Sequence, residues 1–269
     1  MTRLARFLLF CILAAGTMSA VAQPDSVRAV RHTHLFGVGG VNLLDTYLSP
    51  LEYTGWQFTT LHTTERVLRL GSRWTLAARY GGDLGHALSP TDDGKIWDAN
   101  LYAAGQLRRC WQPVANLVLE GGPMVEAFLG GTYSTRNGNN PAQGRVGAAL
   151  GLSGQAAYAF RLWQRNWRAV ATLDVPLVGV AFTPAYGQSY YEIFELKHSD
   201  RNVRCTYFGN APSALLTAVL EVPVGGGSWL ALGYQADVRQ SCLAALKRHS
   251  WGNRFVIGWT RRLQILKND

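Results

Sequence analysis

RVGAALGLSGQAAYAFRLWQRNWRAVATLDVPLVGVAF, residues 145–182, is the stretch that decides the fold. In its first half, apolar side chains occupy the even positions from Val146 to Phe160, and small or polar side chains occupy the odd positions. Side chains on a strand point alternately to its two faces, so this period of two predicts one long β-strand between unlike media. The alternation resumes after residues 162–166. The stretch therefore predicts a hairpin of two long strands.

The length of these strands favours a membrane barrel over a soluble sheet. The alternation holds over about sixteen residues, whereas strands of globular proteins usually have about five or six. A hairpin of a soluble β-sandwich is the alternative, and both the length and the repetition argue against it. We therefore expect an antiparallel transmembrane β-barrel.

The first residues have the character of a secretory signal peptide. Arg3 and Arg6 precede an apolar run over 7–15, and the small-x-small triplet Ala20-Val21-Ala22 follows. This pattern predicts cleavage after Ala22 and a single barrel domain over 23–269. No later segment of the sequence offers the ~18 apolar residues that a membrane helix needs.

Composition and charge also suit an exported barrel. Charged residues are 16%, and the chain has 29 Gly, 9 Trp and 11 Tyr. The formal charge is +9, and without Arg3 and Arg6 the mature chain has 24 basic and 17 acidic residues. No basic run with interleaved aromatics points to nucleic acid. We expect outer-membrane lipids and lipopolysaccharide as partners, together with the barrel-insertion machinery.

The same alternation elsewhere predicts about ten strands, with eight or twelve as alternatives. They lie near 31–41, 53–68, 73–84, 97–108, 116–129, 145–161, 167–182, 213–222, 230–239 and 255–265. The connections alternate in length. Short ones fall near 69–72, 109–113, 162–166 and 223–228, and long ones near 42–52, 87–95, 132–142, 183–210 and 241–250. Since such barrels have short periplasmic turns and long external loops, both termini are expected in the periplasm.

Tryptophans and charged residues fit this arrangement. A periplasmic aromatic girdle is expected from the tryptophans at or beside the short turns, because Trp rings favour the headgroup level: Trp74, Trp111, Trp163, Trp167 and Trp229. A charge network is expected on the lumen faces of the strands: Arg79, Asp83, Asp98, Arg108, Glu120, Glu126, Arg145, Asp174, Glu221, Asp237 and Arg239. Because a barrel of this size is scarcely wider than its side chains, we expect these charges to pair and to plug the lumen.

Candidate catalytic and metal residues are few. The pairs His198-Ser199 and His249-Ser250 fall in expected external loops. Neighbours on an extended chain point to opposite sides, so neither pair forms a catalytic dyad by itself. His32 and His34 share one strand face, but no carboxylate or Cys nearby completes a metal site. We therefore expect no catalytic residue, no metal and no cofactor.

The cysteines allow one disulfide in the mature chain. Cys205 and Cys242 flank the eighth and ninth expected strands on the external side, whereas Cys110 lies at the opposite membrane face. If the connecting turn is centred in 223–228, each of the two cysteines lies about two residues from the level of the other, within the reach of a bond. The oxidising compartment favours it. We predict a Cys205–Cys242 disulfide and a free Cys110.

Three segments resemble a known family. TYLSPLEYTG at 46–55, SYYEIFEL at 189–196 and NRFVIGW at 253–259 resemble an uncharacterised family of exported proteins from Bacteroidota-type Gram-negative bacteria. The resemblance implies an outer-membrane barrel and transfers no activity. The function that we expect is structural or ligand-binding through the external loops. An outer-membrane lipid hydrolase using a loop His and Ser, and a narrow solute channel, are the alternatives.

Overall fold

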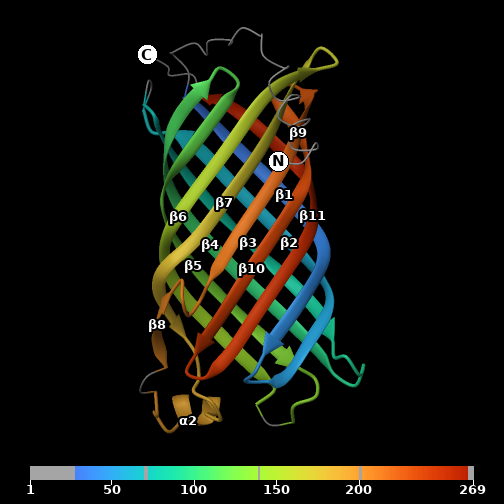
Figure 1. Ribbon diagram of the computed structural model, residues 1–269, viewed down its shortest axis with the longest axis vertical. Helices are drawn as coiled ribbons and strands as arrows, with labels where there is room; N and C mark the ends of the chain where they lie inside the picture. Colours follow the sequence, from blue (N-terminus) through green and yellow to red (C-terminus); the bar gives the residue numbers. More distant parts are fainter. Residues whose placement is uncertain (1–27, 70–71, 139, 200–201, 266–269) are drawn as a thin grey trace, which may run out of the picture.

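The barrel is seen in a computed structural model that describes residues 28–69, 72–138, 140–199 and 202–265. Within these residues, eleven strands and one short helix are formed, and the strands make one antiparallel sheet that closes on itself (Figure 1). The elements are β1 (Arg28–Asp45), β2 (Ser49–Val67), β3 (Trp74–Leu88), β4 (Lys95–Val114), β5 (Leu117–Ser134), β6 (Ala142–Leu162), β7 (Arg165–Phe182), α2 (Tyr190–Phe194), β8 (Val203–Tyr207), β9 (Ser213–Gly225), β10 (Ser228–Leu243) and β11 (Leu246–Ile265).

Ten of these strands form the wall of the barrel. β1 to β7 pair in chain order, β7 pairs with β9, β9 with β10, β10 with β11, and β11 closes the barrel on β1. The short β8 lies alongside one end of β7. The predicted antiparallel barrel of about ten strands is therefore confirmed. The predicted signal peptide, residues 1–22, lies outside the described residues.

The two ends of the barrel differ. The turn end carries the connections 68–73, 115–116, 163–164 and 226–227, together with the start of β1. The last of these is built from glycines, since Gly225, Gly226 and Gly227 all have positive φ angles that L side chains rarely adopt. The loop end carries the connections 46–48, 89–94, 135–141, 183–202 and 244–245. α2 lies at this end, below the strands in Figure 1.

Two of the predicted long loops are wrong. The regions near 42–52 and 241–250 belong mostly to strands, and only residues 46–48 and 244–245 turn the chain there. The strands continue because their inward positions keep the period of two up to Asp45 and Leu243, which are both buried. The remaining loop-end connections are longer than these two turns. The short turn predicted near 109–113 lies instead at 115–116.

The outer surface of the wall is apolar. Leu101 and Leu150 on neighbouring parts of the sheet are 63% and 60% exposed, and many other large apolar side chains also point outward. One irregularity changes the face of β7: its register with β6 shifts where Pro176 and Val178 oppose Gly151 and Leu150. Before the shift the odd positions of β7, such as Leu173, point outward, whereas after it Ala181 points inward and is buried. Unbroken alternation would instead place Ala181 on the apolar outer face. Among the described residues, no helix has the length and apolar character that spanning a membrane requires.

Candidate functional site

An apolar belt closes the middle of the lumen. Inward side chains from eight strands meet there and are nearly inaccessible to solvent: Leu35, Leu61, Tyr102, Ala157, Val170, Val219, Ala231 and Val256. Val118 and Phe128 pack against them. Because side chains at the same level of a small barrel fill its interior, this belt separates the lumen into a turn-end half and a loop-end half.

Ion pairs flank the belt on its turn-end side. Arg108, which is fully buried, forms ion pairs with Glu65 and with Glu120, the latter at 3.3 Å from Nε. Arg31 forms ion pairs with Glu65 at 3.7 Å and with Glu221. Two of these contacts join strands that are not neighbours in the wall, β2 with β4 and β1 with β9, so the ion pairs extend across the interior.

A second set of ion pairs fills the loop-end side of the belt. Arg79 binds Glu126 at 3.2 Å and also pairs with Asp174. Asp237 lies 3.0 Å from Nε of Arg239 and 3.3 Å from the guanidinium of Arg254. Each acidic side chain in this set therefore has at least one arginine partner, as buried charges require.

The predicted lumen residues lie inside the barrel, and most of them pair. Besides the contacts above, Asp98 contacts Arg145 at 2.6 Å, and Asp83 accepts hydrogen bonds from Gln57 at 2.6 Å and Asn100 at 2.8 Å. The network also includes residues that the sequence analysis did not assign to the lumen: Arg31, Asp45, Glu65 and Arg248. Asp45 and Arg248 were missed because they were assigned to loops. Continued alternation beyond the assigned strand ends was the signal that could have found them.

Two larger cavities remain at the ends of the lumen. The turn-end cavity has a volume of about 400 Å³ and is rimmed by Arg31, Arg168 and Arg262. The loop-end cavity has a volume of about 120 Å³. A space of only about 50 Å³ lies among the belt and the turn-end ion pairs. A packed layer therefore separates the turn-end cavity from the loop-end cavity.

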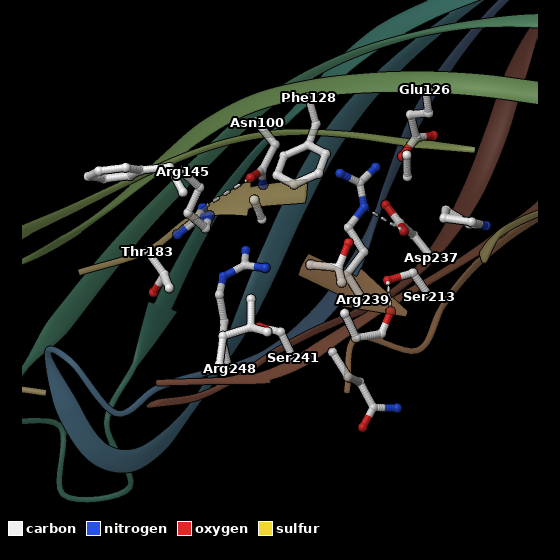
Figure 2. Close-up of a pocket in the computed structure, with 18 of the residues that line it drawn as sticks. Asn100, Glu126, Phe128, Arg145, Thr183, Ser213, Asp237, Arg239, Ser241 and Arg248 are labelled. Carbon is white, nitrogen blue, oxygen red and sulfur yellow. Dashed lines mark hydrogen bonds and ion pairs between the residues drawn. The ribbon is translucent and has the colours of Figure 1, made fainter. Parts of the chain in front are cut away.

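The loop-end cavity combines three arginines with an apolar wall. Figure 2 shows Arg145, Arg239 and Arg248 around it, from β6, β10 and β11. Arg145 is held by Asp98 and by Asn100 at 3.0 Å. The apolar part of the lining comes mainly from β7, β9 and the β10–β11 hairpin: Ala149, Pro176, Ala181, Phe182, Ala211, Ala214, Leu215, Leu243 and Leu246. Such a cavity has the amphipathic lining that small-molecule sites usually have.

Loops cross over the mouth of the barrel at this end. Tyr190 of α2 accepts a hydrogen bond from the main-chain N–H of Gly144 on β6. The Tyr47 hydroxyl, in the β1–β2 turn, donates to the carbonyl of Gln188 at 2.9 Å. Burial raises the pKa of Tyr47 to about 12, and Tyr190 and Asp45 add to the rise, so this hydroxyl keeps its proton at neutral pH. The 183–202 loop is thus fixed to two distant parts of the rim.

The structure places the five predicted girdle tryptophans at the turn end. Trp163 lies in the 163–164 turn and is 78% exposed, Trp74 and Trp111 are also exposed, and Trp167 and Trp229 are half-buried. A second aromatic group on the outer surface, nearer the loop end, was not predicted. Trp56 and Trp97 both pack on His86, with ring centroids 6.0 and 4.5 Å from it. The sequence signal that could have predicted this second group was the presence of Trp residues at outward positions near the loop-end tips of the strands.

The candidate catalytic pairs are not assembled into a site. His198 and Ser199 are exposed in the 183–202 loop. His249 and Ser250 lie on β11 rather than in a loop, which corrects their predicted position. His249 contacts Asn42 at 2.5 Å and stacks on Trp251, both outward, whereas Ser250 occupies an inward position. The two members of this pair therefore point to opposite faces.

The histidines of β1 contact side chains of β2, and the three cysteines among the described residues are unbonded. His34 meets His62 of β2, with their Nδ1 atoms 2.7 Å apart, and His32 bonds Thr64. In the described part of the chain, no three His, Cys, Asp or Glu side chains group in a way that could hold a metal ion. Cys110, Cys205 and Cys242 are free thiols. The Cys205–Cys242 bond stays a prediction.

Comparison with known sequences assigns the chain to a family. Residues 6–269 match the model of the family described as "Protein of unknown function (DUF3316)". The chain belongs to this family. The expected membership of an uncharacterised family is therefore confirmed over nearly the whole chain. No curated protein matches the sequence.

Solved structures similar to this DUF3316 chain include two outer membrane proteins and the translocator domain of an autotransporter. One is the outer membrane protease OmpT from Escherichia coli, with 6% identity, a TM-score of 0.46, and 93% of this chain and 100% of that chain covered. Another is the translocator domain of the autotransporter NalP from Neisseria meningitidis, with 11% identity, a TM-score of 0.43 and 96% of each chain covered. A third is a major outer membrane protein from Thermus thermophilus, with 17% identity, a TM-score of 0.36, and 87% and 99% covered. At these identities the likeness transfers no activity to this chain.

Proposed function

We propose that the protein is a non-conducting β-barrel of the outer membrane that binds a ligand at its loop end. The observation that carries this proposal is the packed layer across the lumen. The apolar belt is closed by buried side chains such as Leu35 and Val256, and Arg108 and Arg79 lie in ion pairs on its two sides. A pore needs a continuous aqueous path, whereas a binding site needs only the cavity that remains beyond this layer.

The outer-membrane location is supported by the surface of the barrel. Its outward side chains are apolar, and tryptophans gather at the turn end, the arrangement of a barrel that meets lipid along its wall. On this proposal residues 1–22 are the cleaved signal peptide, and the barrel-insertion machinery places the barrel in the membrane. Outer-membrane lipids contact the wall, and lipopolysaccharide headgroups balance part of the excess of 24 basic over 17 acidic residues in the mature chain. A Bacteroidota-type source is an expectation from the sequence resemblance alone.

Single-channel recording tests the closed lumen. Purified protein is inserted into planar bilayers, and a porin serves as the positive control for insertion. We expect no steady open-channel current from the wild type. A stable conductance would contradict the proposal and favour a narrow solute channel. The same preparation should show heat-modifiable migration in detergent gels, which establishes that the inserted protein is folded.

The ligand-binding part is tested on protein extracted gently from its own membrane. Native mass spectrometry should detect a retained small molecule in a fixed ratio to the chain. A barrel carrying only lipids in the proportions of the bulk membrane would argue for a purely structural role.

A further inference from the structure

We propose that the loop-end cavity binds a single-chain amphiphile with an anionic head, which enters from the membrane between β8 and β10. This inference rests on the proposed outer-membrane location and adds a ligand class and a route. The arginines of the cavity would hold the head, and the apolar wall would contact the chain.

Arg248 supplies the strongest indication of an anionic head. Its Nη2 atom is buried and has no hydrogen-bond partner among the described residues. Its ion pair with Asp98 spans 3.6 Å, which is too long for a hydrogen bond. A buried donor without an acceptor is unfavourable, so an oxygen atom entering the cavity would gain this free N–H group.

Arg239 adds a second cation on the same cavity. Its Nε donates to Asp237 at 3.0 Å, and its guanidinium lies 4.9 Å from the ring centroid of Tyr102. Within the described residues its terminal nitrogens have no hydrogen-bond acceptor. Guanidinium groups present planar pairs of donors that match carboxylate and phosphate oxygens. Arg239 and Arg248 can therefore accept an anion that the network itself does not provide.

The cavity is too small for the whole of a lipid chain. Its volume of about 120 Å³ is below the roughly 300–1,000 Å³ of ordinary ligand pockets. A head group and the first carbons of one chain can occupy it beside Pro176, Leu215 and Leu246. The rest of the chain must leave the cavity through the wall or through the mouth.

A seam in the barrel wall lies next to the cavity. β7 pairs with β9 only between Arg168 and Asp174, and nearer the loop end its partner is β8. Among the described residues, β8 has no main-chain hydrogen bond to β10. The ladder between β10 and β9 ends at Arg239 and Ser213, and beyond it β10 donates on this side to the chain that links β8 to β9, at the carbonyls of Pro212 (3.0 Å) and Asn210 (2.8 Å). Closed barrels pair every strand edge, so this is the place where the wall is least closed.

Residues on both sides of this seam line the cavity. Thr206 lies on β8, and Gln240 and Ser241 lie on β10. The seam therefore borders the cavity directly.

The outside of the seam is apolar, and the mouth above it is covered. Val203 and Tyr207 of β8 are exposed, and Val238 of β10 is outward as well. On the aqueous side, the 183–202 loop is fixed by the bond from Tyr47 to Gln188 and by the bond between Gly144 and Tyr190. The membrane is therefore the more accessible source of an amphiphile, and its chain can stay in lipid while its head reaches Arg248.

The head group is tested by binding to the folded barrel in lipid nanodiscs. The probes are dodecanoate and dodecyl phosphate, with dodecanol as the uncharged control. We expect saturable binding of one or both anions and none of the alcohol, and the two anions distinguish a carboxylate from a phosphate. Arg248→Leu should weaken binding by about ten- to a hundredfold, because a charge-assisted hydrogen bond is lost.

Matched variants keep this result interpretable. Arg136→Leu removes an exposed arginine of the 135–141 loop, which pairs with Asp93, and it should bind as the wild type does. Arg248→Lys keeps a charge without the planar fork and should retain intermediate affinity if Arg248→Leu fails to fold. Equal affinity of wild type and either Arg248 variant, or binding of dodecanol as tight as that of the anions, would overturn the proposal.

The route is tested by closing the seam. Cys205 and Cys242 point outward on its two sides, and both contact Asn210. In reduced Cys110→Ser protein, a short bismaleimide should join them and slow dodecanoate uptake from the nanodisc membrane at least tenfold. The same reagent should leave uptake unchanged in the Cys110→Ser/Cys205→Ser variant. Unslowed uptake in the bridged protein, or no bridging at all, would overturn the membrane route. A steady conductance in planar bilayers would instead overturn the proposal that the lumen is closed. It would not affect the binding measurements on the Arg248 variants.

Discussion

The carboxylate of Asp98 on β4 lies 2.6 Å from the guanidinium of Arg145 on β6, and the contact reaches over β5, which separates these strands in the wall. Asp98 is 1% exposed and also accepts hydrogen bonds from Thr132 at 2.5 Å and Asn100 at 2.7 Å. Three strands are therefore joined by one buried acid. Since a buried charge without a partner is strongly destabilising, the network should respond to the loss of a single member.

Arg145→Ala should lower the free energy of unfolding by about 3–5 kcal/mol, because the longer contact to Arg248 is then the ion pair that remains to the buried Asp98. Adding Asp98→Asn to Arg145→Ala should restore part of the loss, since the unpaired charge is removed. Urea unfolding in detergent, followed by tryptophan fluorescence, measures both. Arg136→Ala, in an exposed pair, is the control and should change stability by about 0–1 kcal/mol. If Arg145→Ala lowered the free energy of unfolding by no more than Arg136→Ala does, the lumen charges would have to be hydrated.

The depth of the wall in the membrane gives a second prediction. Leu101, beside the apolar belt, and Val224, at the turn end of β9, are 63% and 62% exposed. Leu101→Arg should destabilise the barrel in bilayers by about 2–4 kcal/mol, as arginine does near the bilayer midplane. Val224→Arg should cost only about 0–1 kcal/mol at the interface. Unfolding titrations in liposomes compare the two, and equal effects would contradict a membrane placed around the belt.

Much of this architecture could be predicted from alternation alone. Strands such as 145–161 keep a strict period of two, since one face meets the apolar exterior and the other the lumen. The bulge at Pro176 could not be predicted, because it changes the face of Ala181 without any change in the apolar character of the sequence. β8 was missed for a different reason. Its five residues are too short for periodicity to distinguish them from the surrounding loop.

The candidate site was only partly accessible to the same reasoning. Arg145 and Arg239 could be assigned to the lumen from their strands, but Arg248 was assigned to the expected loop near 241–250. The pairing of β10 with β11 up to Leu243 and Leu246 places it on a strand, at an inward position. The cavity depends on the point at which the pairing partner of β7 changes from β9 to β8. No local sequence pattern predicts that change.

The order of the 183–202 loop should depend on pH through Glu192. Ser189, the N-cap of α2, donates main-chain and side-chain hydrogen bonds to Glu192 and holds the pKa of that carboxyl below its ordinary value of 4.5. A lowered pKa means that the stabilisation is present above the unfolded pKa and is lost as the pH falls through the folded one. Amide exchange in the loop should therefore accelerate as the pH falls below about 4.5, after correction for intrinsic rates.

Glu192→Gln keeps a side chain that can accept these bonds but cannot titrate. Its exchange should be faster than that of the wild type at neutral pH and should lose most of the acid-induced change. Glu195→Gln, one turn further along and outside the capping box, is the matched control. The same pH response in wild type and Glu192→Gln would assign the change to another group.

The last prediction concerns Cys205 and Cys242, which are free thiols in the structure. The main-chain N–H of Cys242 donates to the carbonyl of Asn210 at 2.8 Å, and Asn210 Nδ2 donates to the carbonyl of Cys205 at 3.1 Å. One residue thus connects both cysteines, and the outer surface of a cell is oxidising. We expect them to form a disulfide in the oxidised protein. Because this bond would close the seam between β8 and β10, the membrane route proposed above is expected to be open only in the reduced protein, as in the structure. Thiol counting under denaturing, non-reducing conditions should find one free thiol per mature chain, that of Cys110, whereas three would show that the native seam is unbridged.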